Sequence, residues 1–194
     1  ASEIKFLDAN GKEQYGWTTS WGVTTRLIGT LIMAHSDDNG LVIPPKIATK
    51  HVLLLPFYRN KEEQEEILKY CEQIKNKLAN IHYGVRKLLV HIDKRDIRGG
   101  AKYWQHIKQG APIIIEIGKR ELENSTLTIT RRDHGPEKKV ITQNDFIDKI
   151  TSILDSIQTN IYEKALALLN NNIKPIETLD EFQKFFQQKN PGFA

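Results

Sequence analysis

Hydrophobic positions between residues 51 and 170 alternate between short continuous runs and helical spacing. Val52–Phe57 is a continuous apolar run, which is typical of a strand that is buried on both faces. Residues 61–80 carry apolar positions at helical spacing behind Asn60, a residue type that favours the cap of a helix. The same pattern predicts strands over 85–92, 112–117, 125–131 and 138–141, and helices over 102–109 and 143–170. Strands that alternate with helices predict an α/β domain over this part of the chain.

The first residues of the chain are typical of a β-hairpin. Residues 4–7 and 13–18 are strand-like, and Asn10-Gly11 between them supplies turn chemistry. A hairpin with no second layer to pack on is marginal in water. We therefore expect the sheet to which it belongs to lie largely upstream, which makes the chain a C-terminal fragment.

A short helix is expected after the hairpin. Gly22 is expected to close a strand, and Thr24 or Thr25 is suited to cap the helix that follows. This helix is expected to end near His35, and its predicted buried face comprises Leu27, Ile28, Leu31 and Ile32. At the other end of the chain, residues after Ile173 are expected to begin a further unit with a short helix over 179–187.

Composition excludes several classes of site and protein. Cys71 is the only cysteine of the chain, so an intrachain disulfide and a thiolate zinc site are excluded, and a reducing compartment such as the cytoplasm is expected. Cys71 lies on the predicted buried face of helix 61–80, which makes it a packing residue rather than a nucleophile. No apolar run approaches the roughly 20 residues that span a bilayer. The six histidines show no metal-ligand spacing, so no metal site is expected.

The formal net charge of +4 is concentrated in one segment. Residues 81–140 carry thirteen Lys or Arg and seven Asp or Glu, so that segment is +6 and the remainder of the chain is −2. A local basic excess is compatible with a nucleic-acid partner. A solvated surface of mixed charge is the alternative interpretation.

Residues 19–26, Thr-Ser-Trp-Gly-Val-Thr-Thr-Arg, form the densest group of candidate functional residues. A glycine at the end of a strand permits the close approach of a ligand. A guanidinium on the first turn of the following helix, that of Arg26, can pair with a phosphate and neutralise charge that develops on it. From the residues alone, a helix cap followed by an ordinary surface arginine is the simpler interpretation.

Residues 18–29, together with 32–33, 35–38 and 40–45, resemble the third signature motif of the prolyl-tRNA synthetases, in particular the archaeal/eukaryotic-like type. The rest of the chain resembles the anticodon-binding domain of that family through residues 52–56, 93–96, 110–112, 116–118, 131–133, 157–158 and 181–182. The resemblance implies a class II synthetase anticodon-binding domain with a mixed β-sheet flanked by helices, preceded by the last hairpin, strand and helix of a catalytic domain. The implied boundaries are 1–48 for the catalytic piece, 49–172 for the anticodon-binding domain and 173–194 for the start of a truncated C-terminal domain.

The resemblance also implies roles for individual residues of the third motif. By resemblance, Arg26 contacts the ATP phosphates as a catalytic residue and Thr24 lies against the nucleotide. The implied proline pocket is lined by Ser20, Trp21 and Gly22. The family activates proline with ATP and Mg²⁺, transfers it to tRNA(Pro), and acts as a homodimer. Because the two earlier class II motifs are absent from this chain, we expect the chain alone to be inactive.

The tRNA contacts that the resemblance implies lie in the basic segment. The expected tRNA-binding residues are Lys94, Arg95, Arg98, Lys102, Tyr103, Trp104 and Lys108. The cations are expected to contact phosphates and the two aromatic side chains to stack on unpaired anticodon bases. Packing against the sheet is the alternative interpretation of Trp104.

Two positions depart from the family pattern. The family usually has a glutamate where this chain has Ile107 and an arginine where it has Ile114, and those two side chains read an anticodon guanine. Isoleucine can form neither hydrogen bond. Either Gln105, His106 and Lys108 read the anticodon instead, or discrimination at the last anticodon base is reduced.

Two alternative functions stay open. A non-catalytic RNA-binding paralogue is favoured by Ile107 and Ile114 and disfavoured by Arg26, because a protein that only binds RNA has no use for a phosphate-facing arginine. The threonyl, glycyl or histidyl branch of class II synthetases shares the anticodon-binding domain. The run Ser20-Trp21-Gly22 argues against that branch.

Overall fold

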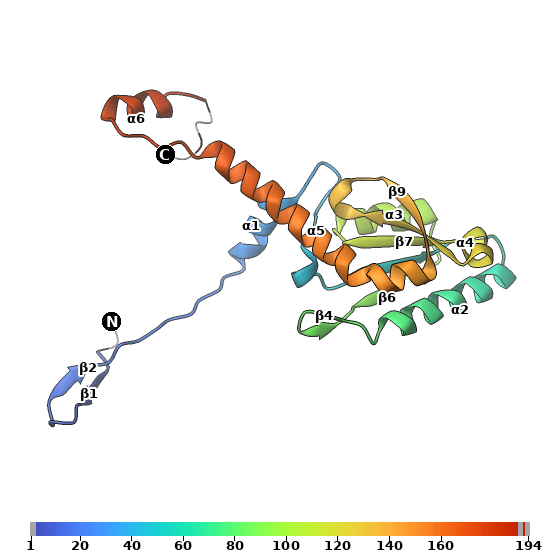
Figure 1. The fold of residues 1–194 in the computed structure, drawn as a ribbon, viewed down its shortest axis with the longest axis horizontal. Helices are drawn as coiled ribbons and strands as arrows, with labels where there is room; N and C mark the ends of the chain where they lie inside the picture. The colour runs from blue at the N-terminus through green and yellow to red at the C-terminus, as the bar shows by residue number, and fades with distance from the viewer. Residues whose placement is uncertain (1–2, 190–191, 193–194) are drawn as a thin grey trace.

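A five-stranded mixed sheet lies at the centre of the molecule (Figure 1). The computed structural model describes residues 3–189 and Gly192. The strands are ordered β6 (Val90–Ile92), β3 (Val52–Pro56), β7 (Ile113–Ile117), β8 (Thr126–Arg131) and β9 (Lys138–Thr142). β6, β3 and β7 are parallel, whereas β8 pairs antiparallel with β7, and β9 pairs antiparallel with β8. The predicted α/β fold, a mixed sheet flanked by helices, is confirmed.

Helices on opposite faces of the sheet make the two parallel connections. α2 (Lys61–Leu78) leads from β3 to β6, and α3 (Gly99–Lys108) leads from β6 to β7 on the other side of β3. Because both crossovers are right-handed by rule and run in opposite directions along the sheet, the two helices lie on opposite faces. The side chains of β3 follow this division, with Val52 and Leu54 in the core under α2 and Leu53 and Leu55 in the core under α3.

The larger core lies between the sheet and the helices α2 and α5 (Gln143–Asn172). The apolar spacing of α2 predicts a buried stripe, and this is confirmed, since all four of its residues are buried, namely Ile67, Cys71, Ile74 and Leu78. Asn60 caps the helix as predicted, and its Oδ1 accepts a hydrogen bond from the Glu63 amide at 2.8 Å. Cys71 is completely buried in this core, and burial raises the pKa of its thiol to about 12. Such a thiol is a packing group rather than a nucleophile at neutral pH.

Helix α5 continues well past the sheet (Figure 1). Its buried residues are Phe146, Ile150, Leu154, Ile157 and Ile161. The apolar spacing of this helix predicts a buried stripe of Phe146, Ile150, Ile153, Ile157, Ile161, Ala165 and Leu168. The prediction is correct in its first half, with Leu154 deeper than Ile153, and wrong at Leu168, which is exposed. After α5 the chain turns into α6 (Leu179–Phe186), close to the predicted short helix. No helix in the described part of the chain combines the length and the apolar composition that crossing a membrane requires.

The N-terminal segments lie apart from the sheet (Figure 1). β1 (Lys5–Leu7) and β2 (Glu13–Tyr15) form the predicted hairpin, and α1 (Arg26–His35) forms the predicted helix. The predicted strand that ends at Gly22 is wrong, because no described strand lies beside residues 16–24 to pair with them. The predicted buried face of α1 is also wrong, since Leu27 is 57% exposed and every other residue of the helix is likewise at least partly exposed.

Five smaller elements differ from the prediction or were missed. Residues 85–92 do not form one strand, because a turn at Gly84 with φ of +61° makes a separate hairpin of β4 (His82–Tyr83) and β5 (Arg86–Lys87). Helix α4 (Lys119–Asn124) was not predicted, since six residues are too few to show an apolar stripe. Two single 3₁₀ turns, η1 (Pro45–Ile47) and η2 (Arg132–His134), precede β3 and follow β8.

Candidate nucleic-acid interface

The face of the sheet that α3 covers is left open over β9. Two rows of side chains cross this face in register, namely Ile114–Thr130–Lys138 and Glu116–Thr128–Val140. The first row runs from Ile114, which is completely buried, to Lys138, which is exposed. The second runs from Glu116, which is partly buried, to Val140, which is 61% exposed. The open part of the face therefore lies between α3 and the outer strand β9.

Aromatic and cationic side chains border this open face. The Lys138 Nζ lies 5.3 Å from the centre of the Tyr103 ring and 2.6 Å from a Glu116 carboxylate oxygen. The Tyr103 and Trp104 rings meet edge to face at 5.9 Å. Tyr103 is partly buried against the smaller core, whereas Trp104 is 50% exposed. Trp104 thus leaves half of its surface open to solvent, and Tyr103 packs beside it.

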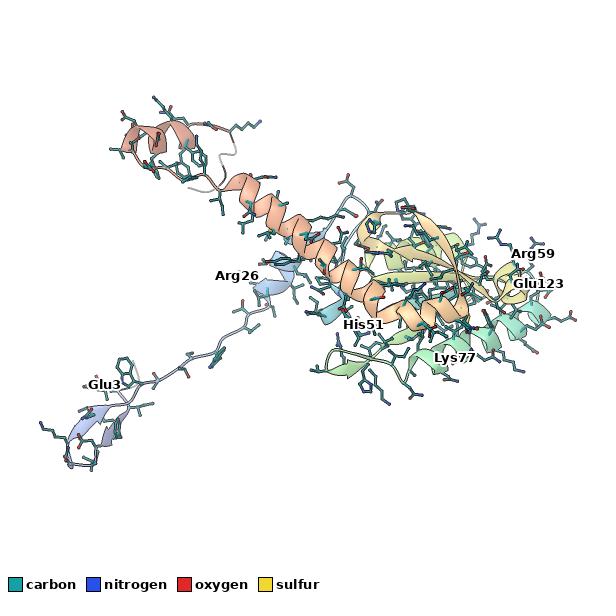
Figure 2. The ribbon with its side chains drawn as sticks, in the orientation of Figure 1. Glu3, Arg26, His51, Arg59, Lys77 and Glu123 are labelled. Carbon is teal, nitrogen blue, oxygen red and sulfur yellow. The ribbon has the colours of Figure 1, made fainter. Side chains whose placement is uncertain are left out.

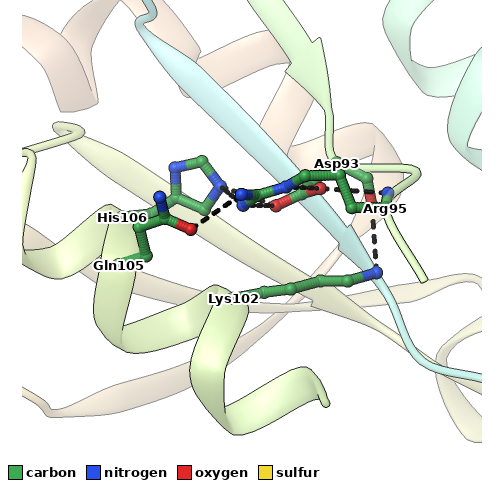
Figure 3. Close-up of polar contacts among 5 residues, drawn as sticks. All are labelled: Asp93, Arg95, Lys102, Gln105 and His106. Atoms are coloured by element: carbon green, nitrogen blue, oxygen red, sulfur yellow. Dashed lines mark hydrogen bonds and ion pairs between the residues drawn. The ribbon is translucent and has the colours of Figure 1, made fainter. Parts of the chain in front are cut away.

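A cluster of polar side chains holds Arg95, which lies in the loop between β6 and α3 (Figure 3). The Asp93 carboxylate accepts hydrogen bonds from Arg95 Nε at 2.8 Å and from Arg95 Nη2 at 2.5 Å. Arg95 Nη1 donates to Gln105 Oε1 at 2.7 Å, and His106 Nε2 lies 2.8 Å from the second Asp93 oxygen. The Asp93 and His106 side chains are buried, whereas the Arg95 side chain is 46% exposed.

The cluster fixes the orientation of the Arg95 guanidinium, which is partly exposed to solvent. Hydrogen bonds from Arg95, the largest cause, and from His106 hold the pKa of Asp93 well below its usual value, although burial acts in the opposite direction. Because the edge of the Arg95 guanidinium is occupied by Asp93 and Gln105, its plane is held in one orientation. A planar cation held in this way is suited to stacking or to a phosphate contact.

The apolar substitutions at 107 and 114 lie together in the smaller core. Ile107 and Ile114 are both buried with Leu53, Leu55 and Ala111. Both side chains belong to this one core and present no polar atom to a base. The two positions for which the resemblance implies a glutamate and an arginine are therefore occupied by buried isoleucines.

The residues of the third motif are not gathered around a cavity. Trp21 is 92% exposed, and Ser20, Gly22 and Thr24 lie in the extended segment before α1. Arg26 is the first residue of α1, where Figure 2 shows its side chain away from the sheet. These residues are therefore remote from the open face next to α3.

Comparison with known proteins gives the family. The chain matches the anticodon binding domain family over residues 51–153, which is more than half of the chain. The chain belongs to this family. Its anticodon-binding domain comprises the sheet described above, with α2, α3, α4 and the first part of α5.

Similar proteins are longer than this chain. A proline–tRNA ligase of Bdellovibrio bacteriovorus is 46% identical over 100% of this chain and 40% of its own length. A proline–tRNA ligase of Protochlamydia amoebophila is 41% identical over 97% of the chain, and one of Akkermansia muciniphila is 38% identical over 96%. The chain spans between 37% and 40% of the length of these three relatives.

The anticodon-binding domain brings most of the predicted tRNA contacts to α3 and its surroundings. Arg98, Trp104 and Lys108 are exposed, and Arg95 is half-exposed. Lys94 is exposed but pairs with Glu72 at 2.7 Å. These side chains stay candidates for contact with tRNA.

Lys102 requires a correction. The residue is 3% exposed, and its Nζ donates to the Asp93 carbonyl oxygen at 3.4 Å (Figure 3). An ammonium in that position supports the Asp93 cluster from within and does not reach a phosphate outside. The prediction of a direct contact failed because the direction of a long side chain depends on the packing of the helix that carries it.

Lys138 and Asp93 were missed as functional candidates. Lys138 was counted in the basic segment, and the alternation of β9, which puts it on the same side as Val140, was the signal that could have singled it out. Asp93 and Arg95 lie two residues apart in one loop, whereas no local pattern indicates the contact of Asp93 with His106 on α3.

The third-motif residues fit one part of a nucleotide site. Arg26 offers a guanidinium at the amino end of α1, where helix amides favour a phosphate. The first turn of α1 holds no acidic residue, and the described residues contain no group of His, Cys, Asp and Glu suited to hold a metal ion. Arg26 is therefore placed where a phosphate contact is possible, and the described residues hold no cluster of three or more metal-ligating side chains.

We predict that Asp93→Asn lowers the unfolding free energy by about 2 kcal/mol at pH 7, because it removes the anion that pairs with Arg95 in a buried site. A carboxylate with a depressed pKa stabilises the folded state above its unfolded pKa, near 3.9, and this stabilisation is lost as the pH falls through the folded pKa. The difference between wild type and Asp93→Asn should therefore shrink progressively below about pH 4.

Urea denaturation at several pH values measures this difference. Asp148→Asn, which makes the same charge change at an exposed position of α5, is the matched control and should show a small difference at every pH. A difference for Asp93→Asn that stays constant from pH 7 to pH 2 would contradict the assignment.

Proposed function

We propose that this chain is the C-terminal part of a proline–tRNA ligase, which activates proline with ATP and transfers it to tRNA(Pro). The similarity to several proline–tRNA ligases over essentially the whole chain carries this proposal. The chain contributes anticodon binding and a share of the ATP and proline contacts. The boundaries proposed are 1–48 for the catalytic piece, 49–172 for the anticodon-binding domain and 173–194 for the start of a further domain. Residues 1, 2, 190, 191, 193 and 194 of these ranges lie outside the described residues.

The open face next to α3 is the proposed contact with the anticodon loop. Trp104 presents a half-exposed ring, and Arg95 presents an oriented guanidinium. Unpaired bases stack on such aromatic and guanidinium planes, and nearby Lys and Arg side chains contact the backbone phosphates. Arg98 and Lys108, near the two ends of α3, are suited to the phosphates.

The third motif is the proposed contact with ATP and proline. Arg26 would bind the ATP phosphates, Thr24 would lie against the nucleotide, and Ser20, Trp21 and Gly22 would line the proline pocket. Their exposure supports the idea that this site is completed by other polypeptide, from the same subunit or from the second subunit of a homodimer. Mg²⁺ is proposed as a cofactor of the whole enzyme, with ligands that lie elsewhere. The single buried cysteine is in keeping with the reducing cytoplasm.

A non-catalytic RNA-binding paralogue is the second candidate function. The buried residues Ile107 and Ile114 favour it, because isoleucine cannot form the hydrogen bonds to a base that the resemblance implies for these two positions. The threonyl, glycyl and histidyl alternatives receive no support from the relatives reported above, which are proline–tRNA ligases.

The first prediction concerns stacking. Trp104→Ala is expected to weaken binding of an RNA stem-loop with a proline anticodon by about tenfold or more, because one base–aromatic stack contributes about 1–3 kcal/mol. Fluorescence anisotropy at fixed salt measures the dissociation constant. Tyr162→Ala, at an exposed aromatic on the distant half of α5, is the control and should leave binding unchanged.

The salt dependence separates stacking from phosphate contact. Lys108→Ala should reduce the slope of log Kd against log salt by about one, whereas Trp104→Ala should leave the slope unchanged. Equal losses of affinity for the Trp104 and Tyr162 variants would argue against the open face as the site.

A second prediction concerns the last anticodon base. Substituting this base is expected to weaken binding by less than about tenfold, because a good bidentate contact contributes about 1–3 kcal/mol and the isoleucine pair offers none. Titration of stem-loops that differ in this base alone, at one salt concentration, measures the ratio. A hundredfold loss would mean that other residues, such as Gln105, His106 or Lys108, read the base.

A third prediction concerns catalysis. The chain alone should give no proline-dependent exchange between ATP and pyrophosphate, whereas a longer protein that contains it should give clear exchange, lost on Arg26→Ala. Exchange by the chain alone would contradict the need for further polypeptide. A longer protein that binds tRNA without exchange would favour the paralogue.

A further inference from the structure

Arg132 connects parts of the chain that are far apart in sequence. The residue follows β8 as the first residue of η2, and its side chain is 1% exposed. Its Nη1 donates to Asp37 Oδ2 at 2.6 Å, and its Nη2 donates to the other Asp37 oxygen and to the Gly40 carbonyl. Its Nε donates to the Ile107 carbonyl at 3.1 Å. One buried guanidinium thus ties the segment after α1 to the end of α3.

The backbone of the same two segments is in direct contact. The Leu41 amide donates to the Lys108 carbonyl at 3.1 Å, and the Ile43 amide donates to the Gly110 carbonyl at 3.2 Å. A Cβ on Gly40 would lie 2.6 Å from the Lys108 Cα, which leaves no room for a side chain. Residues 37–43 therefore lie closely against the carboxyl end of α3.

Arg132 is itself firmly held. Its neighbour Asp133 has a completely buried side chain that accepts hydrogen bonds from Arg131 Nη2 at 2.8 Å and from Asn160 at 2.7 Å. The Asp133 carbonyl accepts a hydrogen bond from Lys164 at 2.6 Å. The turn that carries Arg132 is thereby fixed to α5, so movement of Asp37 relative to Arg132 is movement relative to the whole sheet.

Apart from contacts with α5, helix α1 has little other support. It has no buried residue, and a cavity of about 310 Å³, whose lining includes His35, Asp133 and Lys164, lies between its end and α5. The direction of α1 therefore depends on the segment that follows His35, where Asp37 meets Arg132. Arg26 lies at the other end of the helix, about 15 Å away at 1.5 Å per residue.

We propose that Arg132 is a positioning residue, which through Asp37 fixes α1, and with it Arg26, relative to the anticodon face on α3. The role of Arg26 in this inference rests on the proposed function, whereas the anchoring of α1 does not. A lysine cannot replace Arg132, because one ammonium cannot form the fork to Asp37 and also reach the Gly40 and Ile107 carbonyls.

The distance between two spin labels tests the anchoring without RNA or ATP. Thr30→Cys on α1 and Lys77→Cys on α2 are exposed positions for nitroxide labels. Cys71 stays unlabelled because its thiol is buried and has a pKa raised to about 12. Pulsed electron paramagnetic resonance should give one narrow distance distribution in this background, at least about twofold wider in Arg132→Lys.

Arg120→Lys is the control. It makes the same change on α4, where the guanidinium pairs with Glu121 and touches neither Asp37 nor Asp133, and it should keep the narrow distribution. Circular dichroism should show unchanged secondary structure in both variants, which separates loosening of α1 from unfolding of the sheet.

Asp37→Asn covers the case in which Arg132→Lys does not fold. The Asp37 side chain is 41% exposed, so this change breaks the pair from its outer side. It should widen the distribution as Arg132→Lys does. Narrow distributions in the folded variants at 37 and 132, or equal widening in Arg120→Lys, would overturn the proposal. Failure of the wild-type chain to bind an anticodon stem-loop would overturn the proposed function alone.

Discussion

The whole anticodon-binding domain depends on the burial of β3 on both faces. Its residues alternate between two cores, with Leu54 facing α2 and Leu55 facing α3. Each fully buried aliphatic side chain contributes about 1.5–3 kcal/mol, so one five-residue strand supports both layers. The direction of α3, and hence the surface that Trp104 can occupy, follows from the second of these cores.

Three buried charged residues of this domain, Asp93, Arg132 and Asp133, lie just after strands and are paired there. Asp93 follows β6, and its amide donates to the Leu54 carbonyl at 3.0 Å, which fixes the carboxylate close to β3. Arg132 and Asp133 follow β8 in the same way. Burying a lone charge is costly, whereas a paired and hydrogen-bonded one can be kept where its direction matters. In one case the result is an oriented surface guanidinium, and in the other it is a connection between distant segments.

The sequence was a good guide wherever an element carries its own pattern. β3 and α2 were predicted correctly because a continuous apolar run and a helical stripe each bury against a surface that this chain provides. The same reasoning was wrong for α1, whose apolar stripe faces solvent in the described structure. Apolar spacing reports that a helix has a face to bury, but it does not say which surface covers that face.

The candidate site was harder to predict than the fold. Trp104 was identified, but the burial of Lys102 and the contacts of His106 with Asp93 and of Gln105 with Arg95 depend on how α3 packs beside the end of β6. The departure at Ile107 and Ile114 was visible in the sequence. That the two lie in one core with Leu53 follows only from the pairing of β3 with β7.

The length of α5 gives the far end of the molecule a defined geometry. The helix has 30 residues and contains neither proline nor glycine, so it has none of the usual causes of a kink and spans about 45 Å. Beyond Ile161 none of its residues is buried, although Lys164 still donates a hydrogen bond to the Asp133 carbonyl. Each residue after Lys164 adds about 1.5 Å of length and about 100° of rotation. The length of α5 therefore determines how far from the sheet, and at which angle around the helix axis, the chain leaves α5 toward α6.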